Sequence, residues 1–150
     1  MKEYISSHLK QVQERIQISC NRSGRDIHEV TLIAVSKTKP LEALQAAYEC
    51  GVRDFGENKV QEILQKAPQM PADTRFHMIG HLQRNKVRQV LPFVTMIHSV
   101  DSLRLAEEIH QEAKRINKIV DILLEVNVAG EESKFGFSPE ELMNIIQQIC

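Results

Sequence analysis

A lysine at the end of an apolar segment is the residue best suited to covalent chemistry in this sequence. Lys37 follows Ser36 and a run of mostly branched apolar residues at positions 30–35. Such a run is typical of a strand buried on both faces, and desolvation at its end disfavours the ammonium form of a lysine. A lysine in that state is a nucleophile for aldehydes. The alternative is that Lys37 only marks the end of a strand, and Lys39 is expected to be solvated.

Two histidines four residues apart form a second candidate site. His77 and His81 have the spacing that binds a metal ion on one face of a helix. Gly80 lies between them, however, and no glutamate occupies the position that a zinc-binding HExxH motif requires. We therefore expect no metal site and interpret one or both histidines as groups that orient loops or satisfy backbone atoms near a strand end.

A short basic cluster raises the question of nucleic-acid binding. Arg84, Lys86 and Arg88 could contact phosphate or RNA, although a solvated helix face is the commoner explanation. Aromatic residues make up only 5% of the chain, and 19 Lys and Arg against 20 Asp and Glu give a net charge of -1. Without stacking aromatics or a basic field, RNA binding ranks last among our hypotheses, and nucleic acid is not an expected partner.

The composition is that of an ordinary soluble globular protein. The 150 residues are 42% hydrophobic and 26% charged, which excludes a disordered chain. No segment approaches the roughly 18 apolar residues of a membrane span, and no signal peptide begins the sequence. Cys20, Cys50 and Cys150 lack the spacing of a zinc or disulfide framework. We therefore expect a cytoplasmic protein without a membrane partner.

Hydrophobic periodicity predicts a leading helix and five strand–helix units. Residues 2–23 carry apolar side chains at helical spacing, and Ser23 and Gly24 end that segment. The predicted strands cover residues 30–35, 52–55, 75–79, 93–98 and 120–128, and the helices cover 41–51, 57–66, 84–91, 102–116 and a last segment after Ser138. This alternation is typical of parallel strands joined by right-handed helical crossovers.

Two architectures fit this order of elements. A complete (β/α)8 TIM barrel takes about 250 residues, so five units would form an incomplete barrel. An apolar helical stripe from Leu142 onward that is still running at Cys150 favours this hypothesis. The alternative is a five-stranded, flavodoxin-like doubly wound sheet, which fits the length equally well. In both architectures ligands bind at the carboxyl ends of the strands, where this sequence places its polar residues.

Five motifs, in order along the chain, resemble the signatures of the pyridoxal phosphate homeostasis protein family. They are residues 35–40 (VSKTKP), 55–62 (FGENKVQE), 77–86 (HMIGHLQRNK), 98–102 (HSVDS) and 127–136 (NVAGEESKFG). The resemblance covers the whole chain. It implies an α/β barrel of the alanine racemase N-terminal type, with residues 1–150 forming a single domain that is truncated on its C-terminal side.

The resemblance also implies a cofactor and the residues that contact it. Lys37 would form a Schiff base with the aldehyde of pyridoxal 5′-phosphate (PLP), and Lys134 would be a loop lysine that influences cofactor exchange. The other matching positions lie close to the cofactor: Asn58, His77, Gly80, His81 and Ser99. The implied function is PLP homeostasis without turnover, in which PLP is buffered or delivered to PLP-dependent apoenzymes.

Some expected parts of the site are missing from these 150 residues. Barrels of this kind grip phosphate with loops after strands seven and eight, and the resemblance also places an arginine against the pyridine nitrogen. We therefore expect the first part of a longer family member or a shortened variant, with weak affinity for PLP by itself. The longer protein is expected to be a monomer, whereas exposed sheet edges would make the 150-residue chain self-associate.

An enzymatic function is the alternative hypothesis. A PLP-dependent racemase-like enzyme, or a Schiff-base enzyme without cofactor, needs a positioned general base. The sequence offers four candidates: His77, His81, His98 and Glu57. The racemase activity is doubtful, because the sequence after Lys37 lacks the aromatic and glycine-rich continuation of the racemase lysine.

Overall fold

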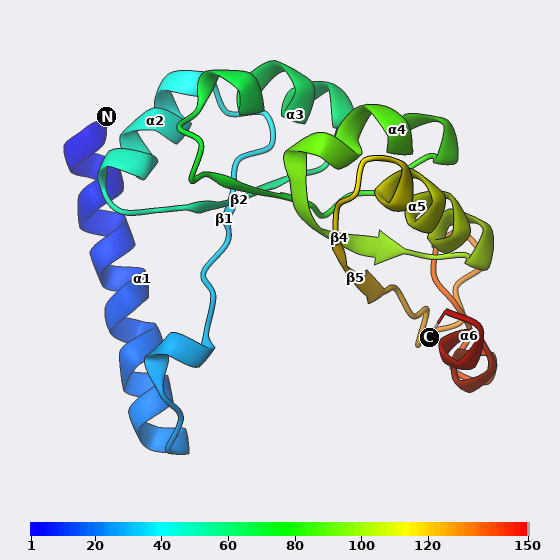
Figure 1. Cartoon of the computed structure of the whole chain (residues 1–150). Coiled ribbons are helices and arrows are strands. Elements are labelled where there is room, and N and C mark those ends of the chain that lie inside the picture. The colour runs from blue at the N-terminus through cyan, green and yellow to red at the C-terminus, as the bar shows by residue number, and fades with distance from the viewer. Residues whose placement is uncertain (150) are drawn as a thin grey trace.

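Five parallel strands form one curved sheet in the computed structural model, which describes residues 1–149 (Figure 1). The strands are β1 (Ala34–Val35), β2 (Asp54–Glu57), β3 (Arg75–Met78), β4 (Val94–Val100) and β5 (Asp121–Leu124). Their spatial order is the same as their order in the chain. A doubly wound sheet reverses this order at its switch point, so the flavodoxin-like alternative is wrong and the sheet is part of a barrel.

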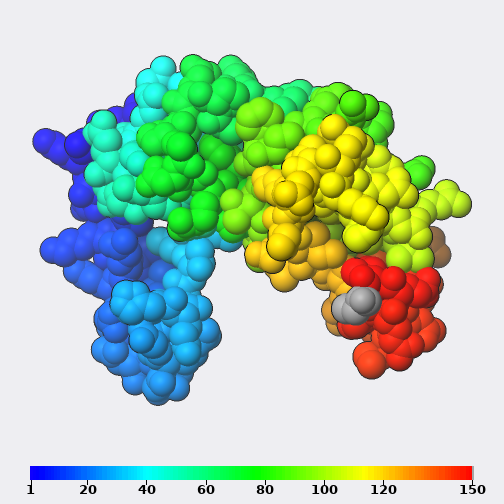
Figure 2. All heavy atoms as spheres, viewed as in Figure 1, coloured from blue at the N-terminus to red at the C-terminus, as the bar shows by residue number. Residues whose placement is uncertain are grey.

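The helices lie on the outer side of this sheet, as they do in a TIM barrel (Figure 1). They are α1 (Lys2–Ser23), α2 (Leu41–Glu49), α3 (Val60–Lys66), α4 (Val87–Val90), α5 (Leu103–Arg115) and α6 (Leu142–Ile149). Helix α1 packs on α2, and α6 packs on α5. Figure 2 shows a hollow between the light-blue region where α1 ends and the red region around α6. Within residues 1–149, no helix has the length and apolar character needed to cross a membrane.

The hydrophobic core fills the space between the sheet and the outer helices. Alternate residues of the strands point outward into it, and these include Phe55, Phe76 and Ile97, all almost completely buried. The rings of Phe55 and Phe76 lie 6.1 Å apart. Helix residues that close the core from outside are Leu44, Ile63, Val87 and Leu105. This packing fixes the curvature of the sheet and therefore the positions of the strand ends.

The inner face of the sheet is more open and more polar. Val35 of β1 and Leu123 of β5 are 55% and 47% exposed, although both belong to strands. A complete barrel fills these positions with layers of side chains from all eight strands, whereas residues 1–149 contribute five. The prediction that the first strand is buried on both faces is therefore wrong.

Two predicted strands are shorter in the structure. Residues 30–35 form a strand only at Ala34 and Val35, because β2 begins at Asp54 and leaves the earlier residues without a partner. The last strand ends at Leu124 instead of residue 128, because its partner β4 ends at Val100. Beyond that point the chain makes one isolated bridge, between Val126 and Phe137.

Two predicted helices also differ. The helix predicted at 57–66 begins at Val60, because Glu57 is the last residue of β2. The segment 84–91 is divided into a 3-10 turn (Arg84–Lys86), the single turn of α4 and a second 3-10 turn (Leu91–Phe93) that contains Pro92.

Capping hydrogen bonds occur before two of the helices. Ser102 is the N-cap of α5, and its hydroxyl accepts a hydrogen bond from the backbone amide of Leu105 at 3.2 Å. The hydroxyl of Ser138 accepts from the amide of Glu141 at 3.4 Å, while the Glu141 carboxylate accepts from the Ser138 amide at 3.3 Å. This reciprocal pair is a capping box before α6.

Candidate functional site

Lys37 lies just beyond the carboxyl end of β1, the edge at which barrels bind their ligands. It occupies the second position of a tight turn that the Lys39 amide closes on the Ser36 carbonyl at 3.1 Å. Its side chain is exposed, so residues 1–149 do not provide the desolvation that we expected there. Within those residues the Lys37 amine makes no hydrogen bond or ion pair, which leaves it available to a ligand.

The ends of three neighbouring strands meet at Gly80. A Cβ atom on Gly80 would lie only 2.7 Å from the Asn58 Cα, so only glycine permits this close approach. The Ser99 hydroxyl donates a hydrogen bond to the Gly80 carbonyl at 2.6 Å. Asn58, Gly80 and Ser99, three of the predicted cofactor residues, are therefore brought together at the carboxyl edge of the sheet.

His77 is buried on the inner face of β3, and its hydrogen-bonding partners are side chains. Its Nε2 lies 3.0 Å from Asp54 Oδ1, and its Nδ1 lies 3.0 Å from His98 Nε2. Both ring nitrogens of His77 therefore contact side chains of adjacent strands, and within the described residues neither hydrogen-bonds a loop or a backbone atom. Burial, together with the neighbouring His77, lowers the pKa of His98.

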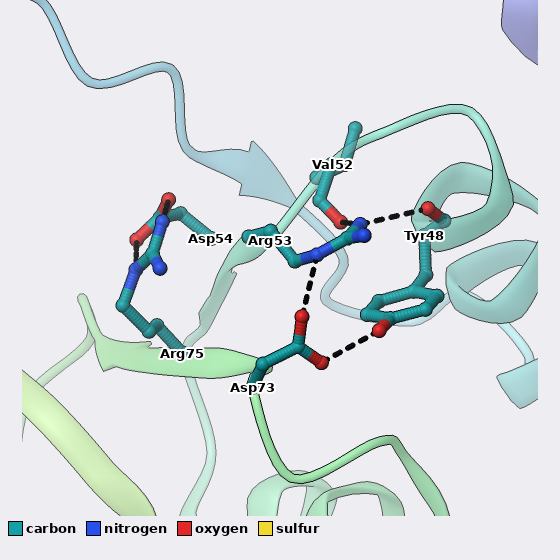
Figure 3. Close-up of polar contacts among 6 residues, drawn as sticks. All are labelled: Tyr48, Val52, Arg53, Asp54, Asp73 and Arg75. Atoms are coloured by element: carbon teal, nitrogen blue, oxygen red, sulfur yellow. Dashed lines mark hydrogen bonds and ion pairs between the residues drawn. The ribbon is translucent and has the colours of Figure 1, made fainter.

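Asp54 connects this histidine pair to the start of β3. Arg75 donates two hydrogen bonds to its carboxylate, at 2.8 and 2.6 Å (Figure 3). Burial opposes ionisation of Asp54, but the hydrogen bonds from Arg75 and His77 outweigh it and lower the pKa of the carboxyl. Nearby, Asp73 joins Arg53 at 2.8 Å and the Tyr48 hydroxyl at 2.6 Å. This second cluster lies at the amino ends of the strands. That end of a barrel contributes to stability, whereas ligands bind at the carboxyl end.

His81 and Lys134 come from different loops that lie close together. The His81 ring stacks on Phe135 with a centroid separation of 3.8 Å, and its Nδ1 lies 3.0 Å from Asp101 Oδ2. Lys134, next to Phe135 in the chain, forms an exposed ion pair with Glu131 at 3.0 Å. The loops after β3 and β5 are thus joined, but no hydrogen bond or ion pair within residues 1–149 links them to Lys37.

A buried ionic cluster beside Lys37 is the feature that the sequence interpretation missed. The Glu57 Oε1 atom accepts hydrogen bonds from Lys66 Nζ at 2.8 Å and from the Ser36 hydroxyl at 2.6 Å. Lys66 Nζ also contacts Glu62 at 2.6 Å. We considered Glu57 only as a general base. The spacing of Glu62 and Lys66 by four residues was a visible signal, whereas the link to Glu57 exists only after folding.

The pKa shifts in this cluster reflect burial and pairing together. Burial raises the pKa of Glu57 even though Lys66 and Ser36 oppose the shift. Burial also acts against the ammonium of Lys66, but hydrogen bonds to Glu57 and Glu62 outweigh it and raise the pKa of Lys66. Lys66 therefore stays charged and is an unsuitable nucleophile. The exposed amine of Lys37 is the better candidate for reaction with an aldehyde.

Comparison with known proteins supports the same fold and family. Residues 7–150 match the family described as alanine racemase, N-terminal domain. A pyridoxal phosphate homeostasis protein of Aquifex aeolicus is 44% identical over 140 residues, which cover 93% of this chain and 61% of that protein. The crystal structure of an unknown protein from Bifidobacterium adolescentis has a TM-score of 0.89 at 37% identity, covering 99% of this chain and 64% of the other.

A structure with bound cofactor is also similar. PipY of Synechococcus elongatus with PLP bound has a TM-score of 0.74 at 34% identity, covering 92% of this chain and 63% of that one. The chain therefore spans less than two thirds of the length of each relative. The resemblance inferred from the five motifs is confirmed by these matches. The chain belongs to the alanine racemase N-terminal domain family, in which its relatives include pyridoxal phosphate homeostasis proteins.

Proposed function

We propose that this chain is a PLP-binding protein of intracellular PLP homeostasis that holds the cofactor covalently on Lys37. The observation that carries the proposal is the exposed, unpaired amine of Lys37 at the carboxyl edge of β1, in a fold that PipY shares at 34% identity with PLP bound. The lysine nitrogen would join the aldehyde carbon of PLP through a C=N bond, and the aldehyde oxygen would leave as water.

The neighbouring residues have supporting roles in this proposal. Asn58, Gly80 and Ser99 would line the site beside the cofactor, where glycine at position 80 lets the Asn58 backbone approach closely. His77 would not bond the cofactor itself, because its ring nitrogens lie against Asp54 and His98. His81 and Lys134 border the site from two loops, where Lys134 can exchange its partner Glu131 for an anionic ligand.

The phosphate group of PLP needs hydrogen-bond donors in addition to the residues named above. In barrels of this kind the loops after strands seven and eight hold phosphate, and residues 1–149 contain five strands. We propose that, in the longer relatives, the part outside the matched region supplies these donors. The 150-residue chain would then form the covalent link with weaker affinity than a complete barrel.

The arrangement supports binding without turnover. Three of the four candidate bases are committed to other contacts: Glu57 is completely buried beside Lys66, and His77 and His98 bond each other. His81 is more exposed but pairs with Asp101. When bound, PLP itself supplies the electron sink for amino-acid chemistry. We propose that the protein buffers this reactive aldehyde in the cytoplasm and delivers it to apoenzymes.

Absorbance and borohydride reduction test the assignment of Lys37. Purified chain with added PLP should give a Schiff-base band, and reduction should fix one PLP on the peptide that contains Lys37. Lys39→Ala is the matched control, because Lys39 is equally exposed two residues away. We expect Lys37→Ala to lose the band and Lys39→Ala to keep it. A reducible band of unchanged intensity in Lys37→Ala would show that another amine holds the cofactor.

Isotope exchange tests the absence of turnover. The PLP-loaded chain should exchange the α-proton of free amino acids no faster than PLP alone in the same buffer. Exchange at a catalytic rate that Lys37→Ala abolishes would favour the enzymatic alternative.

A further inference from the structure

The two residues that flank Lys37 are both held by the buried ionic cluster of Glu57, Glu62 and Lys66. Lys66 Nζ donates to the Ser36 carbonyl at 3.0 Å, and the Ser36 hydroxyl donates to Glu57 at 2.6 Å. On the other side of Lys37, the Thr38 amide donates to Glu62 Oε2 at 2.9 Å. The cluster therefore fixes the backbone immediately before and immediately after the reactive lysine.

Thr38 shows why this restraint is needed. Its φ angle is +63°, in the left-handed region that a β-branched residue rarely adopts. Such a conformation persists only when the surrounding structure enforces it. The hydrogen bond to Glu62 and the closure of the turn on Ser36 provide that restraint. Without it, Thr38 would return to a negative φ and the direction of Lys37 would change.

The burial and pairing of Glu57 and Lys66 keep the two side chains in fixed positions. Glu57 is completely buried and Lys66 is 5% exposed, and they join the end of β2 to the last turn of α3. Glu57 Oε2 is buried and has no hydrogen-bond partner within the described residues. A buried ion pair is seldom a gain in stability over apolar residues of the same size, so a positional role is a reasonable hypothesis for its presence.

We propose that Glu57, Glu62 and Lys66 are positioning residues that set the turn at Ser36 and Thr38 and so aim the Lys37 amine at the cofactor aldehyde. This inference rests on the proposed function of Lys37. The three residues act on Lys37 through the backbone of its neighbours and do not touch the cofactor. If the cluster only anchored α3 to the sheet, its loss would lower stability without a specific effect on the turn.

Glu62 is the most suitable position for a test, because it is partly exposed and bonds Thr38 directly. The variants are Glu62→Ala and Glu62→Asp, whose shorter side chain keeps the charge but withdraws it from Thr38. Gln61→Ala, at the exposed neighbouring position on α3, is the control. Glu62→Gln should keep the restraint on the turn, because its side-chain amide oxygen can still accept a hydrogen bond from the Thr38 amide.

Two measurements on the full 150-residue chain decide the matter. The first is hydrogen exchange of the Thr38 amide without PLP, which should become about tenfold faster in Glu62→Ala and Glu62→Asp, as loss of a hydrogen bond to a charged group implies. The second is the rate at which the reducible band forms on Lys37 with PLP, which should fall about tenfold. Gln61→Ala should leave both unchanged, and Glu62→Gln should stay within about twofold of the wild type.

The outcomes separate this inference from the proposed function. If the wild type forms no band on Lys37, the proposed function is wrong, and the Thr38 exchange still decides whether the cluster holds the turn. If the wild type forms the band and Glu62→Ala forms it equally fast, the positioning role is overturned while the function of Lys37 stands. The positioning role is also overturned if the Thr38 amide exchanges at the wild-type rate in both Glu62→Ala and Glu62→Asp.

Discussion

Asp54 Oδ1 lies 3.0 Å from His77 Nε2 on the inner face of the sheet, which joins two adjacent strands through a buried polar contact. His98 continues the contact onto a third strand. In the register of the sheet, His77 lies beside Gly56, where the side chains of Ile79 and Ile33 occupy the space that a Cβ would take. Asp54, His77 and His98 thus form a polar network on the inner face of the sheet, where most barrels have layers of apolar side chains.

Acidification should weaken this chain of contacts. The pKa of His98 is lowered from its ordinary value of 6.5, so the folded protein favours the neutral imidazole. The unfolded chain then binds a proton at higher pH than the folded one, and the stabilisation is complete above pH 6.5 and is lost as the pH falls below it. We expect the free energy of unfolding, measured with urea, to fall as the pH is lowered from about 6.5 to about 5.

A pair of histidine variants identifies the responsible group. His98→Gln should flatten the dependence of stability on pH, whereas His110→Gln, at an exposed position of α5, should retain it. Equal slopes in His98→Gln and the wild type would mean that His98 is not the group concerned.

Gly80→Ala should disturb the contact between the ends of β2 and β3. The new Cβ would meet the Asn58 backbone, which cannot move without breaking the strand end. We expect a loss of about 1–3 kcal/mol in the free energy of unfolding, as for other overpacked sites. Gly56→Ala is the comparison, because its Cβ would meet the movable tips of Ile79 and Ile33. The urea midpoint should fall less in Gly56→Ala than in Gly80→Ala, and the reverse order would contradict the close approach at Asn58.

Breaking the Glu57–Lys66 pair on one side should be more harmful than removing it completely. Lys66→Met leaves the buried carboxylate of Glu57 without its cation, which should reduce the free energy of unfolding by about 3–5 kcal/mol. The double variant Glu57→Gln/Lys66→Met should recover part of this loss, because no buried charge remains. A double-mutant cycle from urea unfolding gives the coupling energy. Strictly additive losses would show that the two side chains do not interact.

The open edges of the sheet should make the 150-residue chain self-associate. β1 and β5 are the edge strands, and the exposed Leu123 of β5 presents apolar surface beside an unpaired backbone. Light scattering over a concentration series should show growing particles, and Leu123→Lys should reduce the growth, since a charge on an edge strand opposes pairing. Gln111→Lys, at an exposed position on α5, is the control because it makes the same change of charge. A monomer at all concentrations would contradict this prediction.

Local patterns in the sequence predicted the order and type of most elements. The β-branched runs and the helical spacing identified five strand–helix units. These features depend on neighbours in the chain, so they can be recognised without the fold. The start of β1 at Ala34 and the end of β5 at Leu124 could not, because they depend on pairing with the neighbouring strand.

The sequence by itself therefore determined a parallel strand–helix repeat and placed Lys37 after its first strand. Only the tertiary structure decided that the strands follow one another around a barrel, that Gly80 contacts Asn58, and that the side chains on either side of Lys37 meet a buried ionic cluster. The physical reason is that pairing register and core packing bring strand ends together across 20 or more residues, as between Ser36 and Glu57 at a separation of 21. Local periodicity carries no information about such contacts.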